Sequence, residues 1–152
     1  RPEYLDADDI TIEQVIKEFL NSVDADIVIL VHPNSPFLTS ETITKCIEKV
    51  KSDMYDSAFV AFEFDKLAWF NNKPLNYSLD KETPSREEIE PVTLELSSLY
   101  VFEKKIFLDK ERRVGDKPFI MNVSHFEGHD INTQEDFEIA ELIVNSGMYP
   151  KV

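Results

Sequence analysis

The sequence predicts an α/β fold in which a mostly parallel β-sheet is covered by helices. Short apolar runs, the first of them Ile27–Val31, alternate along the chain with segments whose apolar residues recur at helical spacing. An unbroken, mostly β-branched run is typical of a strand that is buried on both faces, as parallel strands are. The length of 152 residues favours one domain, and we expect residues 1–152 to form it.

The stretch from Asp26 to Leu38, DIVILVHPNSPFL, organises the predicted fold. The strand should end at His32, because the two prolines that follow it cannot donate to a strand ladder. Ligands of open α/β sheets gather at the carboxyl ends of strands. The HPNSP loop is therefore a candidate binding loop, in which Asn34 and Ser35 could bond a ligand. The alternative is a tight turn that only joins a strand to a helix.

N-cap residues followed by apolar residues at helical spacing predict three helices, and a fourth is short. The first has a capping box, Thr11 with Gln14, and the last has Thr133 as N-cap with Asp136 at the third position. Gly147 is a natural stop for the last helix. The second helix starts at Thr39 or Ser40, and the short one is expected over residues 104–109.

Three further strands are expected over residues 57–64, 92–102 and 118–123. The strand–helix–strand order implies a right-handed crossover that places residues 57–64 beside Ile27–Val31 as a parallel neighbour. Between residues 57–64 and 92–102, residues 66–91 form an excursion with a small hairpin and asparagines in its turn. Trp69 and Phe70 either pack within the hairpin or face a partner subunit.

The charge balance excludes some classes of partner. Sixteen basic against thirty acidic residues give a net charge of −14, which opposes binding to nucleic acids and to anionic membranes. No apolar run approaches the roughly 20 residues that span a bilayer. A single cysteine, Cys46, is expected in the core and fits a reducing compartment such as the cytoplasm. Because the chain begins at Arg1, we expect an N-terminal segment to precede it.

The loop Glu127–Asn132 carries the candidate metal ligands. Asp130 and Asn132 are two residues apart, so in an extended segment their side chains point to the same side. Such oxygen ligands, completed by water and phosphate oxygens, suit Mg²⁺. The alternatives are a zinc site that includes His125 and His129, and a merely solvated acidic loop.

The arginines form a third candidate site. Arg86 and the pair Arg112-Arg113 are clustered cations in an acidic chain, and a guanidinium group binds phosphate or carboxylate through two hydrogen bonds. The alternative, which the residues by themselves favour, is surface pairing with neighbouring carboxylates.

Several segments together resemble the acylneuraminate cytidylyltransferase family. RPEYL with the Asp8-Asp9 pair is similar to the family's RPxxLAxD, LVHPNSPFL to LLQPTSPLR, and EGHDINTQEDFEIAE to E-x-IDIDTxxDFxxAE. WFNNKPLNY, SREEIEPV and LYVF resemble the region that carries the dimer-forming lobe. The resemblance covers essentially the whole chain. It implies a nucleotidyltransferase-like three-layer architecture, with residues 66–91 as a dimerisation lobe.

The resemblance also implies an activity: transfer of CMP from CTP to a 2-keto sugar acid, sialic acid or a related nonulosonate, with release of pyrophosphate. The implied cofactor is Mg²⁺ and the implied assembly is a homodimer. Roles carry over by position to these residues: Asp130 (catalytic, metal), Asn132 (metal), Arg86 (catalytic, reaching the partner's site), Arg1 (nucleotide), and His32, Asn34, Ser35 and Leu96 (sugar).

The departures from the family pattern keep other functions open. The family's LxARxGSKxxxxKN stretch would lie before Arg1, so the 152 residues by themselves are expected to be inactive. Five positions near the expected site also differ: His32 replaces glutamine, Thr39 replaces arginine, Leu96-Ser97 replace the usual Asn-Gly, and Asn132 replaces aspartate. One alternative is a non-catalytic or fragmentary homologue that keeps the fold and the dimer. The other is a zinc-dependent hydrolase that uses the loop of His125 and His129.

Overall fold

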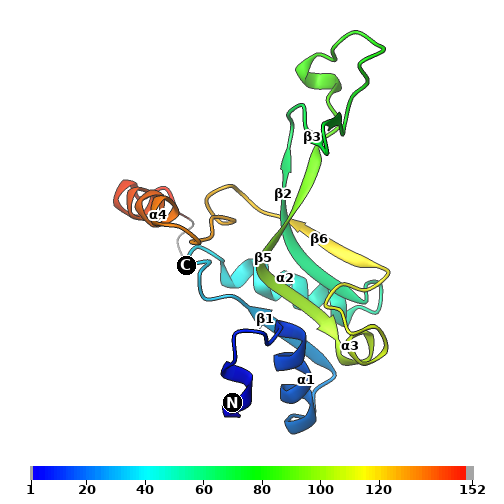
Figure 1. The fold of residues 1–152 in the computed structure, drawn as a ribbon, viewed down its shortest axis with the longest axis vertical. Coiled ribbons are helices and arrows are strands. Elements are labelled where there is room, and N and C mark those ends of the chain that lie inside the picture. Colours follow the sequence, from blue (N-terminus) through cyan, green and yellow to red (C-terminus); the bar gives the residue numbers. More distant parts are fainter. Residues whose placement is uncertain (1, 150–152) are drawn as a thin grey trace.

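The computed structural model describes residues 2–149, which fold around one four-stranded sheet (Figure 1). The strand order is β1-β5-β2-β6. These strands are β1 (Ile27–Val31), β2 (Ser57–Phe64), β5 (Val92–Glu103) and β6 (Pro118–Asn122), close to the ranges that the apolar runs predict. The α/β class is confirmed.

The prediction of a mostly parallel sheet is wrong. β5 lies between β1 and β2 and is antiparallel to both, and only the β2–β6 pair is parallel. The reason lies in the connections. No crossover helix separates β2 from β5, so the chain turns back through residues 65–91 and pairs antiparallel with the strand it has just left. β1 and β2 still run in the same direction, but they are not neighbours.

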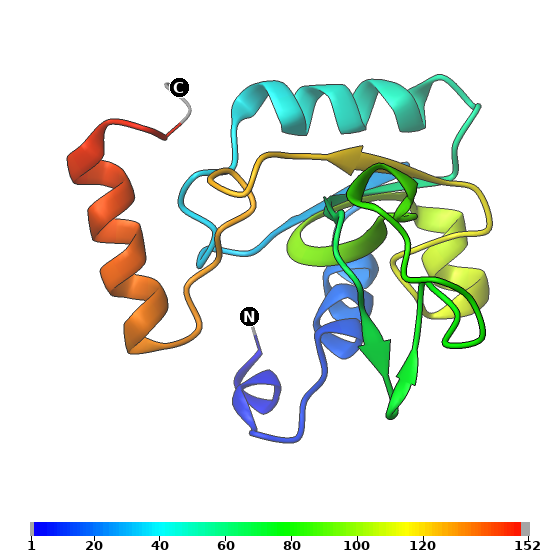
Figure 2. The same cartoon turned by 90° about the horizontal axis from the view of Figure 1, so that it is seen from above.

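Helices cover both faces of the sheet, which gives three layers (Figure 2). α1 (Ile12–Ser22) and α3 (Lys104–Lys110) lie on one face, and α2 (Ser40–Lys51) lies on the other. The Thr11–Gln14 capping box is present, and the N-cap of α2 is Thr39. The first face buries Ile16, Leu20, Val28, Phe59, Ala61, Tyr100, Phe102 and Phe107; the second buries Cys46, Val50, Ala58, Val60, Leu99 and Val101.

The strand β1 is not buried on both faces, contrary to the prediction. Ile29 and Val31 are each 46% exposed. Both point to the side of the sheet that α2 covers, but α2 packs over β2, β5 and β6 instead. β1 is therefore an edge strand of the described sheet, and only the α1 side of it is well covered.

The segment between β2 and β5 projects from the body as a lobe, defined here as residues 66–91 (Figure 1). It contains the predicted hairpin, β3 (Trp69–Phe70) with β4 (Lys73–Pro74), and a short 3-10 turn, η2 (Arg86–Glu88). Asn71 and Asn72, with φ of 49° and 59°, form the turn in the left-handed conformation that asparagine tolerates.

α4 (Gln134–Ser146) stands beside the sheet and not on it (Figure 2). Its capping box, Thr133 with Asp136, and its stop at Gly147 are as predicted. It is anchored by Ala140 and Ile143, which pack on Phe37 in the loop after β1. A second 3-10 turn, η1 (Glu3–Asp6), precedes α1. None of the helices in residues 2–149 is long and apolar enough to cross a membrane.

Candidate active site

Two loops that are remote in sequence lie side by side at the carboxyl ends of β1 and β6 (Figure 1). The Ile131 N–H donates to the Asn34 carbonyl at 2.8 Å. The Asn34 side-chain amide donates in return to the Ile131 carbonyl at 3.3 Å and to Asn132 Oδ1 at 3.1 Å. The HPNSP loop and the acidic loop, which the sequence offered as separate candidates, therefore form one site. Both amide donors of Asn34 serve to join them.

A second connection between the loops involves Thr39 and Glu127. The Thr39 hydroxyl and the Thr39 backbone N–H donate to Glu127 Oε1, at 2.8 Å and 3.2 Å. The same hydroxyl accepts from the Thr42 N–H as the N-cap of α2. The Glu127 carboxylate thus lies at the positive end of a helix, where a negative charge is stabilised. The acidic loop is held in place by the start of α2.

Asp130 and Asn132 point to the same side, as their spacing predicts. The Asn132 amide donates to Asp130 Oδ2 at 2.7 Å. The contact is made by the Asn132 amide nitrogen, so the Asp130 carboxylate is the oxygen ligand that this pair presents to a magnesium ion, which takes most of its ligands from water and phosphate. The Asn132 oxygen faces the HPNSP loop and accepts from the Asn34 amide, so Asn132 would have to turn its amide group to offer that oxygen to the same ion. The residue types suit Mg²⁺, with a single negative charge where two aspartates would give two.

Asp136 fixes the end of the acidic loop. Its Oδ2 accepts from the Thr133 hydroxyl (2.8 Å), the Thr133 N–H (2.8 Å) and the Asn132 N–H (3.0 Å). These bonds, the one from the Thr133 hydroxyl first, hold the pKa of the Asp136 carboxyl below its ordinary value. Asp136 therefore stays ionised at neutral pH and accepts hydrogen bonds that hold the loop in place. The carboxylate that contacts the Asn132 side chain is that of Asp130.

The histidines do not form the zinc cluster that was the alternative to a magnesium site. His129 Nε2 lies 2.8 Å from the Asp136 carbonyl oxygen, and its ring packs against Phe37. The His125 ring packs between Phe62 and Phe64, with centroids 4.8 Å and 5.4 Å away. Nowhere in residues 2–149 do three or more histidine, cysteine or acidic side chains gather in a way that could hold a metal ion. The zinc interpretation therefore has no support in the described chain.

The remaining predicted site residues lie elsewhere or differ in role. Arg86 is in the lobe and donates to Asp65 at 2.9 Å and 3.2 Å, so within one chain it stays outside the two-loop site. Arg112 pairs with Asp116, and Arg113 with Glu13, which is the pairing role that the residues favoured. Leu96 packs against Gly128 and supports the acidic loop from β5. Arg1 lies outside the described residues.

His32 and Ser35 remain candidates for ligand contact. The His32 N–H donates to the Ser98 carbonyl at 3.0 Å, which extends the β1–β5 ladder by one residue. His32 Nε2 and Ser35 Oγ are buried and have no hydrogen-bond partner within residues 2–149, and neither does Ser98 Oγ. No motif or spacing singles out Ser98, because it joins the site only through strand pairing with a segment 66 residues earlier. Its place directly before the apolar run of β5 was the one available signal.

The fold matches solved nucleotidyltransferase structures at low sequence identity. 4-Diphosphocytidyl-2C-methyl-D-erythritol synthase from Anaerococcus prevotii is 19% identical with a TM-score of 0.60, over 89% of this chain and 67% of that one. The bifunctional IspDF of Campylobacter jejuni is 13% identical with a TM-score of 0.59, over 83% of this chain and 33% of that one. CMP:2-keto-3-deoxy-manno-octonic acid synthetase in complex with CTP is 11% identical with a TM-score of 0.61, over 92% of this chain and 70% of that one.

These likenesses establish the fold, and the chain spans from a third to about two thirds of the lengths of the three proteins. No curated protein sequence matches it significantly. The sequence itself shows which family the chain belongs to. The sequence model of the cytidylyltransferase family matches residues 1–141, a range that includes both loops of the site. The chain belongs to the cytidylyltransferase family.

Proposed function

We propose that this protein transfers CMP from CTP to a 2-keto sugar acid, sialic acid or a related nonulosonate, and releases pyrophosphate. The observation that carries the proposal is the joining of the HPNSP loop to Asp130 and Asn132 through Asn34. Membership of the cytidylyltransferases supports the proposal that the first loop binds the acceptor and that the second binds the metal ion. The CTP complex of the similar 2-keto-3-deoxy-manno-octonic acid synthetase supports a nucleotide substrate of the same kind.

The reaction needs positioning and charge neutralisation more than a covalent nucleophile. The acceptor hydroxyl attacks the α-phosphorus of CTP, and the bond to pyrophosphate breaks. A chain with a net charge of −14 repels a triphosphate, so bound Mg²⁺ would supply the neutralising charge. Asp130 and Asn132 would hold that ion, while His32 and Ser35 would orient the acceptor and Arg1 would contact the nucleotide. Asn34 and Leu96 would position the two loops.

Pyrophosphate release from CTP tests the proposal. The assay uses the gene-encoded protein, including any residues that precede Arg1, with Mg²⁺ and a panel that contains N-acetylneuraminate and 2-keto-3-deoxy-manno-octonic acid. We expect release with one sugar acid and a CMP-sugar product identified by mass spectrometry. Release that does not depend on the sugar, or a product that lacks CMP, would contradict the proposal.

A non-catalytic homologue is the second candidate function. The observation in its favour is Asn132, which supplies one negative charge fewer than a pair of aspartates. Binding of CTP in the presence of Mg²⁺, without pyrophosphate release for any sugar acid, would favour this alternative over the transferase. Calorimetry with CTP and with ATP as a control separates nucleotide recognition from non-specific binding.

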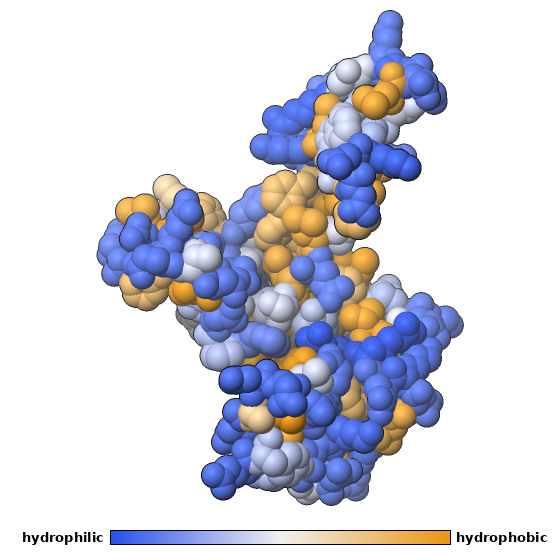
Figure 3. Space-filling view, viewed as in Figure 1, coloured by the Kyte–Doolittle hydropathy of each residue, from blue (hydrophilic) through white to orange (hydrophobic). Residues whose placement is uncertain are grey.

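We also propose that the lobe pairs two copies of the chain. It exposes a group of large apolar side chains, and Figure 3 shows apolar residues on the lobe and on the strand ends beneath it. Exposed apolar patches of this kind mark interaction sites. In such a dimer Arg86, which pairs with Asp65 outside the two-loop site of its own chain, would reach the partner's site. The exposed residues are Leu67, Trp69, Phe70, Leu75 and Leu79.

Trp69 is the only tryptophan of the chain and is 55% exposed, so its fluorescence reports the state of the lobe. We expect a dimer by sedimentation at micromolar concentration and a red shift of the emission on dilution, because the monomer exposes the indole. Phe70→Glu should give a monomer with red-shifted emission at all concentrations. Leu108→Ala, an exposed leucine on α3, is the matched control. A wild-type monomer at micromolar concentration would refute the assignment.

A further inference from the structure

Three buried polar atoms, two in the HPNSP loop and one on the strand beside it, lack a hydrogen-bond partner within residues 2–149. They are His32 Nε2, Ser35 Oγ and Ser98 Oγ. One more atom of the described chain has the same property, Glu103 Oε2, but it lies 2.7 Å from the Lys105 ammonium group. Buried polar groups are nearly always paired, so unpaired ones on residues that are joined by backbone hydrogen bonds need an explanation.

The three residues are neighbours in the backbone hydrogen-bond network. The bond from the His32 N–H to the Ser98 carbonyl, at 3.0 Å, continues the ladder in which Val31 pairs with Leu99. His32 and Ser98 are therefore directly opposite each other, and opposite residues of antiparallel strands point to the same face. The Ser35 N–H donates to the His32 carbonyl at 3.4 Å and closes the turn that follows β1.

The burial of the two serines argues for a built site rather than a chance grouping. Ser98 is 1% and Ser35 is 7% exposed. A surface serine satisfies its hydroxyl with solvent, whereas these two hydroxyls need a polar partner that enters the site. Ser97, the sequence neighbour of Ser98, is exposed, which provides a matched comparison in the same strand.

The chemistry of the three groups selects the kind of partner. A serine hydroxyl can both donate and accept, and an imidazole nitrogen does one or the other according to its tautomer. A sugar hydroxyl also donates and accepts, so it can pair with all three groups. A carboxylate only accepts, and it is better matched by arginine or lysine. The cluster therefore suits the neutral polyol part of an acceptor rather than its acid group.

We infer that Ser98, together with His32 and Ser35, is a specificity-determining residue that binds hydroxyl groups of the acceptor sugar. This inference rests on the proposed function, and it assigns a role to a position of β5 that the family resemblance did not single out. It also predicts which part of the acceptor lies at the end of β1. The hydroxyls lie on the cluster, and the phosphates lie towards Asp130.

Ser98→Ala, compared with Ser97→Ala, tests the inference in the gene-encoded protein. We expect Ser98→Ala to raise the KM for the sugar acid about tenfold and to leave the KM for CTP unchanged, because one hydrogen bond to the acceptor is lost. The melting temperature without ligand should stay the same, because the hydroxyl has no partner to lose. Ser97→Ala should match the wild type, and Ser35→Ala is the second variant should Ser98→Ala fold poorly.

Thermal shift measures the binding of the free sugar acids, N-acetylneuraminate and 2-keto-3-deoxy-manno-octonic acid. This measurement distinguishes failure of the inference from failure of the proposed function. Stabilisation of the wild type that Ser98→Ala weakens and Ser97→Ala preserves would support the inference even without pyrophosphate release. Pyrophosphate release with an unchanged sugar KM in Ser98→Ala would overturn it and leave the transferase intact. A large fall in the ligand-free melting temperature of Ser98→Ala would also overturn it, since the hydroxyl would then be a structural group. The absence of any stabilisation of the wild type by the sugar acids would overturn the inference as well.

Discussion

Asp130→Ala is expected to reduce pyrophosphate release by about 100-fold or more, the usual loss when a group that stabilises transition-state charge is removed. Asp130 supplies the carboxylate of the Asp130–Asn132 pair, and no other acidic side chain of residues 2–149 is hydrogen-bonded to Asn132 except the structural Asp136. Initial rates at several Mg²⁺ concentrations measure the effect. Glu135→Ala, a change to an exposed acid in the first turn of α4, is the control for the loss of one charge. Unchanged rates in Asp130→Ala would remove this residue from the reaction.

Asn132→Asp examines the same pair without relying on activity. The amide of Asn132 donates to Asp130 Oδ2 at 2.7 Å, so a carboxylate in its place would put two negative charges in contact. We expect a lower melting temperature without metal and its recovery with millimolar Mg²⁺, because the ion neutralises both groups. Asn145→Asp on α4, which is exposed, should show no such recovery. A melting temperature of Asn132→Asp that does not respond to Mg²⁺ would argue against a metal at this position.

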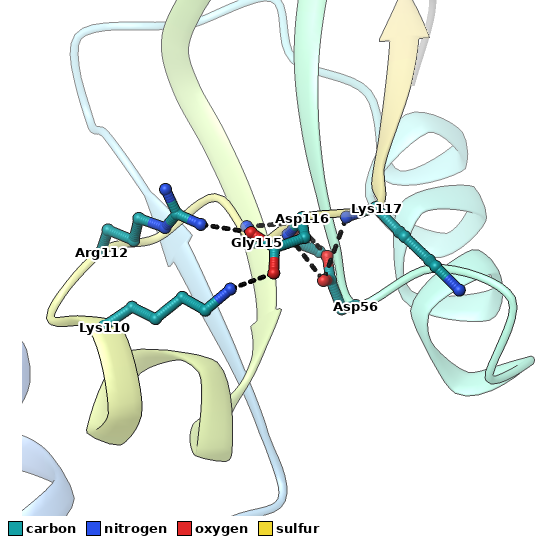
Figure 4. Close-up of polar contacts among 7 residues, drawn as sticks. Asp56, Lys110, Arg112, Gly115, Asp116 and Lys117 are labelled. Atoms are coloured by element: carbon teal, nitrogen blue, oxygen red, sulfur yellow. Dashed lines mark hydrogen bonds and ion pairs between the residues drawn. The ribbon is translucent and has the colours of Figure 1, made fainter.

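Gly115→Ala is expected to destabilise the fold by about 2 kcal/mol or more, at the upper end of ordinary point mutations. Gly115 lies directly against Asp56 in the connection between α3 and β6 (Figure 4). A methyl group added at Gly115 would lie well within 3.0 Å of the Asp56 carboxyl atoms, closer than a real Cβ contact. Chemical denaturation measures the loss. Gly128→Ala is the milder comparison, because its nearest neighbour is the flexible end of Leu96.

The clash matters because Asp56 organises this connection. Its Oδ2 accepts from the backbone N–H groups of Asp116 (2.8 Å) and Lys117 (3.1 Å), and its Oδ1 accepts from the Ser57 hydroxyl (2.9 Å). The Ser57 oxygen accepts in turn from the Gly115 N–H at 2.8 Å. Figure 4 shows Lys110 and Arg112 around Asp116, with which both form ion pairs. A bulky residue at position 115 would disrupt all these bonds together, and a Gly115→Ala protein of wild-type stability would contradict this account.

The same site makes a pH-dependent contribution to stability. Burial by itself would raise the pKa of the Asp56 carboxyl, but the hydrogen bonds from Ser57, Asp116 and Lys117 outweigh it, and the pKa lies below the ordinary 3.8. Because the pKa of Asp56 is lower in the folded protein than in the unfolded chain, ionised Asp56 stabilises the fold fully at pH values above the unfolded-state pKa of about 3.8. This stabilisation is lost as the pH falls from about 3.8 towards the folded-state pKa. Asp56→Asn should remove this part of the acid sensitivity.

Local signals predicted the elements of the fold well. The apolar runs gave the ranges of β1, β2 and β6 within a residue, and the capping boxes at Thr11 and Thr133 gave the starts of two helices. Asn71 and Asn72 indicated the hairpin turn. Each of these features depends on residues within a few positions of one another, so the sequence by itself contains the necessary information.

The pairing of remote segments could not be predicted in the same way. Nothing in the composition of β5 shows that it inserts between β1 and β2, and this insertion made the expected parallel sheet mixed and brought Ser98 to His32. The contact between Thr39 and Glu127 joins residues 88 positions apart. The candidate metal pair was predicted because Asp130 and Asn132 are close in sequence, whereas the residues that support it are not.

Amide chemical-shift mapping with CTP and Mg²⁺ examines whether the HPNSP loop and the acidic loop form one nucleotidyl-transfer site. We expect the shifts to concentrate in residues 32–39 and 127–132, with smaller changes in the lobe. ATP in place of CTP is the control for specific recognition of the nucleotide. Binding of CTP that perturbs other residues and leaves both loops unchanged would show that these loops are not the nucleotide site.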